Sequence, residues 1–254
     1  MKVSVIQFER NEKYDVDVNI AQMEQQIDLC KESNLIVLPE MWATGYYCFE
    51  RYHHIEENNK IIDFLCRKAK EIGAYIAGGT IIEKIEDQYY NSLPFISPEG
   101  KCIATYRKRN LVTFNSEEVK LIQNGKESTV VDTPFGRIGF AICYDVRFPK
   151  NFIEMTEKNV DIIVLSAAWS FPRLEHWCLL SQCRAIENVS YLIACNCVGT
   201  ERGNVYFGHS AIYDPWGTKI AAAGIEKTIV SAEINPEHVQ EIRKKFPVLR
   251  DRLQ

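Results

Sequence analysis

Apolar side chains recur along this chain with two spacings, and each spacing predicts a different kind of element. Short runs that are almost wholly apolar predict buried strands at residues 3–8, 35–38, 74–82, 137–143, 161–166 and 228–234. Apolar residues three to four positions apart predict helices at 18–32, 60–72, about 149–157 and about 174–188, and a last helix is expected from Pro236. Gly73 is expected to end the second of these helices.

Two stretches predict hairpins, because a turn sequence separates two strand-like runs. The turn PEG separates YNSLPFIS from KCIATYRK, and the turn DPWG lies within HSAIYDPWGTKIAAAG. Strands alternate with helices early in the chain and hairpins come later, which predicts an α/β fold with layered, mixed sheets. Many strands are apolar at every position, so two stacked sheets with helices outside would cover them. No linker or repeat interrupts the chain, and we expect one domain over residues 1–254.

Composition narrows the classes of protein to consider. Hydrophobic residues make up 46% and charged residues 25% of the chain, as in ordinary globular proteins. The net charge of −4 gives no general attraction to nucleic acid or to an anionic membrane, and the short basic run at 107–109 is typical of a solvated face. The first residues do not resemble a signal peptide, and no stretch approaches the ~20 apolar residues of a membrane span. We therefore expect a cytoplasmic protein.

The chain has nine cysteines, which a protein without a secretory signal keeps as free thiols. No C-x-x-C pair is present, and the five histidines show no zinc-binding spacing, so a metal site is not expected. Most of these cysteines should be small buried hydrophobic residues.

Three polar residues directly follow apolar strands, which is an expensive place for a polar group. Glu40 follows LIVLP, Lys108 ends CIATYRK on the face that also carries Tyr106, and Cys143 closes the strand of GFAICYDVRFP. Each has an ordinary alternative: a surface acid at a strand end, an edge-strand lysine that reaches solvent, and a buried core cysteine. A turn from strand to helix would expose Cys143 and favour its thiolate.

Together, the three residues supply the functional groups that covalent acyl transfer requires. A carboxylate can act as a base, a lysine can stabilise negative charge, and a cysteine can attack a carbonyl carbon. A papain-type enzyme would instead pair the cysteine with a histidine. The histidines of this chain, at 53, 54, 176, 209 and 238, do not follow strands in a comparable way.

With these residues in place, the chain resembles the nitrilase superfamily of carbon–nitrogen hydrolases over nearly its whole length. LPEMWATGY resembles the glutamate motif of that family, YRKRNL its lysine motif and GFAICYDVRFP its cysteine motif. The resemblance implies a Glu40–Lys108–Cys143 triad and a four-layer αββα sandwich. It also implies a homodimer or larger homo-oligomer, a small-molecule amide substrate, and no metal or organic cofactor.

Two further positions are assigned by the resemblance. Family members carry a second glutamate seven residues before a glycine, and Glu118 and Gly125 match that spacing. The resemblance implies that Glu118 orients Lys108 and the substrate; a surface acid is the alternative. The family usually has histidine two residues after the lysine, where this chain has Asn110. Because an amide hydrogen-bonds but does not titrate, we expect altered support around an intact triad.

The residues after the cysteine resemble the omega-amidase branch, whose substrates are small dicarboxylic acid monoamides such as 2-oxoglutaramate and 2-oxosuccinamate. The pattern C-Y-D-x-R-F and the spacing of Trp169, Arg173, His176 and Trp177 carry this resemblance. It makes the Tyr144 backbone N–H a candidate oxyanion donor. Candidate substrate-binding residues are Arg147, Trp169 and Arg173.

Several alternatives stay open at this point. Arg147 could form a structural pair with Asp145, Trp169 could serve in packing alone, and His176 and Trp177 are expected to be structural. Other activities to consider are those of a deaminated-glutathione amidase or of an amidohydrolase for N-carbamoyl amino acids or amines. A protein of another class, a scaffold or binding protein with a vestigial site, would also fit parts of the pattern.

Overall fold

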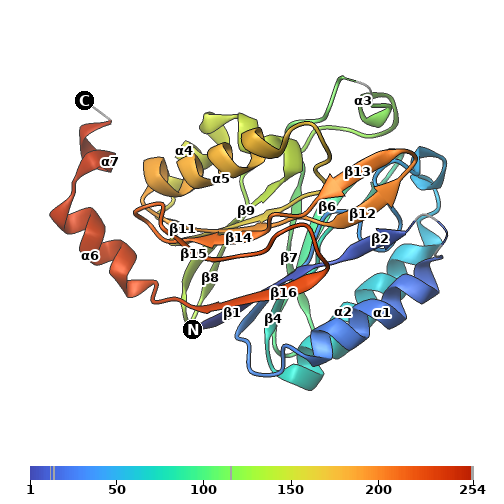
Figure 1. Ribbon diagram of the computed structural model, residues 1–254, viewed down its shortest axis with the longest axis horizontal. Helices are drawn as coiled ribbons and strands as arrows, with labels where there is room; N and C mark the ends of the chain where they lie inside the picture. Colours follow the sequence, from blue (N-terminus) through green and yellow to red (C-terminus); the bar gives the residue numbers. More distant parts are fainter. Residues whose placement is uncertain (12, 14, 115, 253–254) are drawn as a thin grey trace.

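The protein is described here by a computed structural model that covers residues 1–254 except 12, 14, 115 and 253–254. Two large β-sheets stack face to face, and helices cover the outer face of each sheet (Figure 1). This four-layer αββα arrangement confirms the predicted fold class. The apolar strands explain it, because a sheet that is apolar on both faces must be covered on both.

The first sheet combines parallel and antiparallel pairs. Strand β1 runs parallel to β3 and antiparallel to β16, and β6 pairs antiparallel with β4, β5 and β7. The strands are β1 (Lys2–Gln7), β3 (Leu35–Val37), β4 (Tyr75–Ala77), β5 (Ile81–Ile85), β6 (Gln88–Ile96), β7 (Cys102–Arg107) and β16 (Thr228–Glu233).

The second sheet has six strands in the order β15-β14-β11-β10-β9-β8, with β9, β10 and β11 parallel. Its strands are β8 (Val130–Thr133), β9 (Gly136–Ile142), β10 (Ile162–Ser166), β11 (Tyr191–Cys195), β14 (Ala211–Tyr213) and β15 (Lys219–Ala222). A small third sheet consists of β2 (Glu9–Asn11), β12 (Val198–Glu201) and β13 (Asn204–Phe207).

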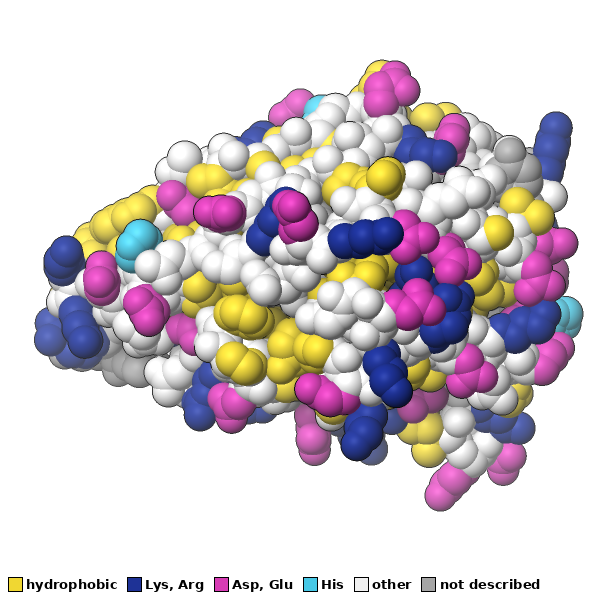
Figure 2. Space-filling view, turned by 90° about the horizontal axis from the view of Figure 1, so that it is seen from below, with side chains coloured by type: hydrophobic (Ala, Val, Ile, Leu, Met, Phe, Trp, Pro, Cys, Tyr) yellow, Lys and Arg dark blue, Asp and Glu magenta, His cyan; other side chains and the backbone are white. Residues whose placement is uncertain are grey.

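Helices α1 (Val16–Asp28) and α2 (Glu56–Ile72) lie on the first sheet, and α4 (Pro149–Glu157) and α5 (Leu174–Asn188) on the second (Figure 1). The remaining helical segments are η1 (Phe49–Arg51), α3 (Glu118–Leu121), η2 (Cys143–Arg147), α6 (Glu237–Lys245) and α7 (Val248–Asp251). Figure 2 views the molecule from below, where basic and acidic side chains are interspersed with hydrophobic ones. No described helix is both long and apolar enough to cross a bilayer.

Some boundaries differ from those predicted. Helix α2 begins at Glu56 rather than at residue 60, because its first turn is polar and shows no apolar spacing. The expected strand 74–82 is interrupted at Gly78 and Gly79, where the chain turns with φ +69° at Gly79. A side chain at Gly79 would collide with the Pro39 carbonyl, so a glycine is required there.

A single core cluster joins the two sheets. It contains β1, β3 and β6 side chains from one sheet and β9, β10 and β11 side chains from the other. A second cluster lies between the first sheet and helices α1 and α2. These two layers hold β3, β7 and β9 in place, and Glu40, Lys108 and Cys143 all come shortly after the ends of those strands.

Candidate active site

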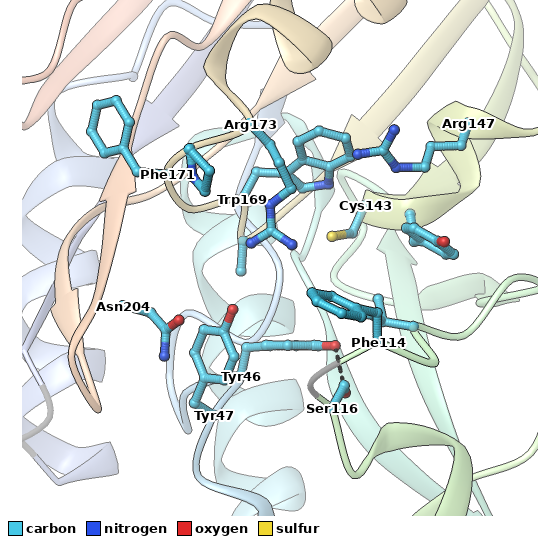
Figure 3. A pocket seen from close by; sticks show the side chains of 14 residues that line it. Tyr46, Tyr47, Phe114, Ser116, Cys143, Arg147, Trp169, Phe171, Arg173 and Asn204 are labelled. Atoms are coloured by element: carbon cyan, nitrogen blue, oxygen red, sulfur yellow. Dashed lines mark hydrogen bonds between the residues drawn. The ribbon is translucent and has the colours of Figure 1, made fainter.

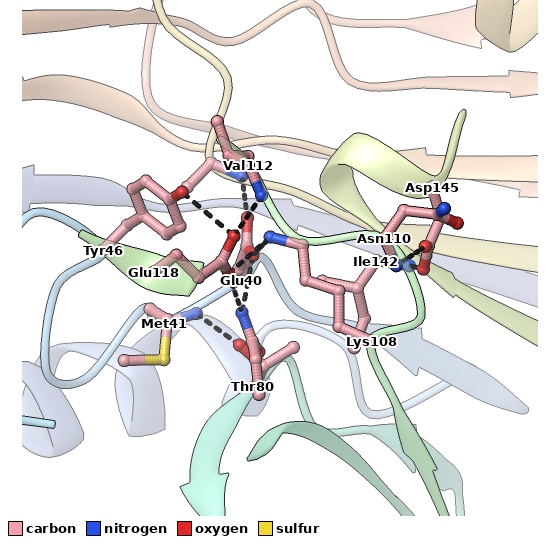
Figure 4. Close-up of polar contacts among 12 residues, drawn as sticks. Glu40, Met41, Tyr46, Thr80, Lys108, Asn110, Val112, Glu118, Ile142 and Asp145 are labelled. Atoms are coloured by element: carbon pink, nitrogen blue, oxygen red, sulfur yellow. Dashed lines mark hydrogen bonds and ion pairs between the residues drawn. The ribbon is translucent and has the colours of Figure 1, made fainter. Parts of the chain in front are cut away.

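Glu40 and Lys108 at their strand ends, together with Glu118 at the start of α3, bring two carboxylates and an ammonium into contact. The Nζ atom of Lys108 lies 2.9 Å from Oε1 of Glu40 and 2.8 Å from Oε1 of Glu118. Figure 4 shows the lysine side chain reaching between the two glutamates. All three side chains are fully buried, so neither the edge-strand alternative for Lys108 nor the surface alternatives for Glu40 and Glu118 apply.

Electrostatics keep Lys108 charged in this buried position. Burial by itself lowers the pKa of the ammonium, but Glu118 and Glu40 outweigh burial and raise the pKa well above its ordinary value of 10.5. Lys108 therefore stays a cation at neutral pH. Its ammonium also lies over the ring of Tyr46, 5.2 Å from the ring centre.

Glu118 is held by donors on both of its oxygens. Its Oε2 accepts from the backbone N–H of Val112 at 2.8 Å and from the Tyr46 hydroxyl at 3.4 Å, while Oε1 accepts from Lys108. With its hydrogen-bonding positions occupied, Glu118 is placed to anchor Lys108. These contacts leave the expected role of Glu118 toward Lys108 and the substrate a prediction.

Cys143 stands at the turn between β9 and η2 in an unusual backbone conformation. Its φ of +48° lies in the left-handed region, which costs a non-glycine residue on the order of 1–3 kcal/mol. Its side chain is only 4% exposed, but it lines a cavity. The strained turn directs the sulfur into that cavity (Figure 3).

The expectation that the turn favours a thiolate is wrong for the free protein. Burial and then the Glu40 charge raise the pKa of the Cys143 thiol well above its ordinary value of 9.0, and Lys108 only partly opposes them. The segment that follows is a short 3-10 helix, so its dipole adds little. Cys143 therefore holds its proton until a base removes it, and Glu40 is the carboxylate beside it.

The cavity has a volume of about 350 Å³, which suits a small organic molecule. Figure 3 shows the Cys143 sulfur on its inner wall, with Tyr46 and Tyr47 on one side and Trp169 and Arg173 on the other. The lining residues are Tyr46, Tyr47, Val112, Phe114, Ser116, Cys143, Tyr144, Arg147, Ala168, Trp169, Phe171, Pro172, Arg173 and Asn204.

Arg147 does not pair with Asp145. The Asp145 oxygens accept from the Tyr106 hydroxyl at 2.7 Å and from the backbone N–H groups of Ile142 and Asn110 at 2.9 Å. The Arg147 guanidinium instead lies 4.7 Å from the centre of the Trp169 ring, with a hydrogen-bond contact to His176. Within the described part of the chain, Arg147 has no ion-pair partner, so its charge is available at the cavity.

Asp145 is a buried carboxyl group with no cation among its hydrogen-bond partners. Burial, partly offset by its hydrogen bonds, raises the pKa of Asp145 to about 6. Its bonds to the N–H of Ile142 and to Tyr106 tie the turn after Cys143 to β7 and β9. Asp145 thus fixes the backbone around the cysteine.

Of the other candidate side chains, Arg173 lines the cavity, Trp177 lies in the core, and Trp169 contacts both. Arg173 is anchored on Ser170, with Nη2 2.8 Å from Oγ, and it has no carboxylate partner among the described residues. Trp169 contacts both the cavity and the core, since its ring lies 5.7 Å from that of Trp177. Trp177 is fully buried and donates to the His209 carbonyl, as expected for a structural residue.

Asn110 supports the site from behind. Its backbone N–H donates to Asp145, and its side-chain oxygen accepts from Asn151 at 2.6 Å. The asparagine thereby connects the segment after Lys108 to helix α4 and to the turn after Cys143. The altered residue supports the site through hydrogen bonds without titrating.

Two site residues were not identified from the sequence. Asn91 donates to Glu40 at 2.8 Å from within β6, and Tyr46 contacts Glu118 and Lys108. The available signal for Asn91 was an amide in YNSLPFI, a strand in which Ser92 also carries a polar side chain. Tyr46 lies within LPEMWATGY, but an aromatic residue there could equally have belonged to the core.

Comparisons with known proteins show the family to which the chain belongs. A family model described as carbon-nitrogen hydrolase matches residues 2–244. The chain is 36% identical over 222 residues to a 2-oxoglutaramate amidase of Bacillus subtilis, covering 87% of this chain and 85% of that protein. It is 30% identical over 231 residues to omega-amidase NIT2-B of Xenopus laevis, covering 87% of this chain and 84% of that protein.

The fold also matches a solved structure of the same superfamily. Nit3 of Saccharomyces cerevisiae, a member of branch 10 of the nitrilase superfamily, superimposes with a TM-score of 0.85 and 27% sequence identity. The match covers 97% of this chain and 94% of that chain.

Proposed function

The chain belongs to the carbon–nitrogen hydrolase family and is a hydrolase that acts on amides, and we propose that it cleaves the terminal amide of a small carboxylated amide. The favoured substrates are 2-oxoglutaramate and 2-oxosuccinamate, and the products are the dicarboxylic acid and ammonia. One observation carries this choice: Arg147 and Arg173, which have no carboxylate partner among the described residues, line the same cavity as Cys143. A guanidinium binds a carboxylate strongly, often through two hydrogen bonds.

In the first half of the reaction, Cys143 attacks the amide carbonyl while Glu40 takes the thiol proton. The negative oxygen that forms is stabilised by the Lys108 ammonium and by the backbone N–H of Tyr144. The first N–H groups of a helical turn lack partners within the helix, which favours this use of Tyr144. Glu40 then gives its proton to the nitrogen, the C–N bond breaks, and ammonia leaves a thioester on Cys143.

In the second half, Glu40 takes a proton from water as the water oxygen attacks the thioester. The C–S bond breaks, the acid is released, and the proton returns to the sulfur. Glu118 exchanges no proton in this scheme; it holds Lys108 at the oxyanion. Apart from the substrate and water, each step uses only side chains and backbone groups of the protein.

Substrate recognition is proposed to use the part of the cavity lining that contains Arg147, Trp169 and Arg173. Arg147 and Arg173 would hold the carboxylate, and Trp169 supports Arg147 through the face of its ring. Replacing Arg147 or Arg173 with Met should raise KM for 2-oxoglutaramate by about 10- to 100-fold, as for the loss of a charged hydrogen bond. KM for a neutral amide of similar size should change much less.

The test is an ammonia-release assay over 2-oxoglutaramate, 2-oxosuccinamate, glutamine, deaminated glutathione and N-carbamoyl amino acids, with Cys143→Ala as the control. We expect the first two to have the highest kcat/KM. Turnover of a carbamoyl compound with no release from 2-oxoglutaramate would exclude the omega-amidase assignment. Full activity in Cys143→Ala would exclude the mechanism.

We further propose that two copies associate through the outer face of α5. This face exposes Leu179 and Ile186, and the neighbouring turn and tail expose Trp216 and Phe246, whose rings lie 5.6 Å apart. An apolar surface of this kind is typical of an interface between subunits. Light scattering coupled to size-exclusion chromatography should give a dimer or larger assembly, and Leu179→Asp should shift it toward the monomer.

Residues 1–254 are proposed to act as one domain in a reducing compartment such as the cytoplasm. The shared core between the sheets supports a single folding unit. All nine cysteines are free thiols, which supports a reducing environment. A single cooperative unfolding transition, and recovery of the protein with cytoplasmic markers on cell fractionation, would test the two parts separately.

A further inference from the structure

We propose that Asn91 is a positioning residue of the catalytic centre, which occupies one oxygen of Glu40 and thereby directs the thiol proton to the other. This inference rests on the proposed function of Glu40 as the base. Asn91 lies on β6, outside all three motifs; among the described residues it neither lines the cavity nor forms a hydrogen bond with Cys143.

The contacts of Asn91 parallel those of Lys108. Its Nδ2 atom lies 2.8 Å from Oε1 of Glu40 and 3.3 Å from Oε1 of Glu118. Lys108 Nζ bonds the same two oxygens at 2.9 and 2.8 Å. Two donors, one charged and one neutral, therefore bridge the same pair of buried carboxylates.

Only one orientation of the Asn91 amide is compatible with these neighbours. The reverse orientation would place its oxygen against two carboxylate oxygens, where none of the three can donate. In the observed orientation, Oδ1 of Asn91 is buried and has no hydrogen-bond partner in the described part of the chain. An unpaired buried carbonyl costs stability, so the contacts with the two carboxylates are what set this orientation.

Backbone pairing fixes where Asn91 stands. The backbone N–H of Lys108 donates to the Asn91 carbonyl at 2.8 Å, directly beyond the β6–β7 pair Ser92 and Arg107. Neighbours across two paired strands project to the same side of a sheet. The hairpin therefore delivers the amide and the ammonium together to the two glutamates.

The consequence for Glu40 follows from counting its donors. Oε1 receives both Lys108 and Asn91, which uses its two lone-pair directions, whereas Oε2 receives the backbone N–H of Ala168 at 3.0 Å. The same Ala168 N–H also interacts with the Cys143 sulfur. Oε2 is thus the oxygen that faces the thiol and has a direction left to accept its proton.

A neutral donor suits this position better than a second cation would. Glu40 and Glu118 together carry one negative charge more than Lys108 balances. A further lysine would neutralise that excess and weaken Glu40 as a base, because a nearby positive charge disfavours protonation of a carboxylate. An amide orients the carboxylate without removing the charge needed to take a proton.

The test compares Asn91→Ala with Ser92→Ala, the neighbouring buried residue on β6, whose hydroxyl contacts Glu83 instead. We expect Asn91→Ala to lower kcat by about 10- to 100-fold with little change in KM, as for the loss of a group that orients a catalytic base. The acidic limb of its pH–rate profile should move to higher pH, because ionised Glu40 loses a donor. Ser92→Ala should leave kcat and the acidic limb of the pH–rate profile unchanged.

A second readout separates this proposal from the proposed function. Alkylation of Cys143 by chloroacetamide is expected to depend on Glu40 but needs no substrate. The acidic limb of the pH profile of the alkylation rate should also move to higher pH in Asn91→Ala. If Cys143 of the wild-type protein is alkylated but no ammonia is released from any amide, the proposed function is overturned. The alkylation rates of wild type and Asn91→Ala can still be compared in that case. If Asn91→Ala does not fold, Asn91→Ser provides the same comparison. An unmoved acidic limb in the folded variant would overturn the positioning role.

Discussion

Two buried clusters in this protein contain the same kinds of group: a cysteine, a glutamate and a cation. In the first, Cys143 lies beside Glu40, which bonds Lys108. In the second, Cys48 Sγ lies 3.1 Å from Oε1 of Glu201, which pairs with Arg10 at 3.3 Å. Only the first borders the cavity of about 350 Å³. Residue types at short distances therefore do not suffice for an active site.

In the second cluster, both carboxylate oxygens of Glu201 have hydrogen-bond donors. Glu201 also accepts from the Tyr206 hydroxyl at 2.5 Å and from the backbone N–H of Tyr46 at 3.1 Å. One glutamate faces one arginine, so the carboxylate charge is balanced by a cation. Burial and Glu201 raise the pKa of Cys48 to about 12. This cluster holds the loop that carries Tyr46 and is structural.

The first cluster differs in charge, in backbone and in access. Two glutamates share one lysine, the cysteine stands in a left-handed turn at φ +48°, and the sulfur faces the cavity. Cys48 has an ordinary φ of −83°. In this comparison, the strained turn and the unbalanced carboxylate, more than the proximity of a thiol to an acid, distinguish the proposed active site.

The largest expected effect comes from the two cysteines. Cys143→Ala should lower kcat/KM on the order of 10⁴-fold or more, because the nucleophile is removed. Cys48→Ala should keep kcat within about threefold of wild type and lose some stability from the vacated core space. Ammonia release, together with thermal unfolding, measures both. Comparable activity losses in the two folded variants would contradict the distinction.

The two cations should separate activity from stability. Lys108→Met and Arg10→Met each leave a buried carboxylate uncompensated, and each should lower the free energy of unfolding by about 3–5 kcal/mol. Lys108→Met should also lower kcat by about 100- to 1000-fold, because it removes an oxyanion donor. Arg10→Met should stay within about tenfold of wild type where it is folded. Denaturant unfolding and steady-state kinetics give the two quantities separately.

Asp145 tests what a buried carboxyl group does with no cation beside it. Its pKa in the folded protein is raised to about 6, above its ordinary 3.8, so the folded state binds this proton more tightly than the unfolded state. The stabilisation is complete below about pH 4 and is lost as pH rises through about 6. The difference in unfolding free energy between wild type and Asp145→Asn should therefore fall by about 2 kcal/mol between pH 4 and pH 6.5. Parallel curves for the two proteins would contradict this.

The smallest effect concerns two glycines with positive φ. A Cβ at Gly45, where φ is +91°, would lie 1.8 Å from Oε1 of Glu201, whereas nothing lies within 4 Å of one at Gly73, where φ is +72°. Gly73→Ala should cost about 1 kcal/mol for the backbone alone. Gly45→Ala should cost about 2 kcal/mol more, since it also displaces Glu201. Chemical denaturation of both variants measures the difference in unfolding free energy. Equal losses of unfolding free energy would contradict the prediction, because they would show that Glu201 can be displaced at little cost.

Much of the fold could be predicted because its strands are short and apolar on both faces. The runs at 35–38 and 161–166 correspond to β3 and β10, and the alternation in CIATYRK correctly placed Tyr106 and Lys108 on a buried face. The polar strand β2 and the hairpin of β12 and β13 were missed, because Glu9–Asn11 carries no apolar pattern and the run 191–199 is interrupted by only one polar side chain, Asn196.

The sequence by itself determined which residues could do chemistry: Glu40, Lys108 and Cys143 each follow an apolar strand, and a polar group in that place needs a partner or a task. Tertiary structure decided which of them meet, because strand pairing and sheet stacking are contacts between residues far apart in the chain. Only the tertiary structure showed that Asn91 bonds Glu40 and that Arg147 lies against Trp169 rather than pairing with Asp145. It also showed that Cys143 lines the cavity and Cys48 does not. A hydrogen bond, an unpaired charge and access to a cavity depend on three-dimensional neighbours, which local sequence patterns do not specify.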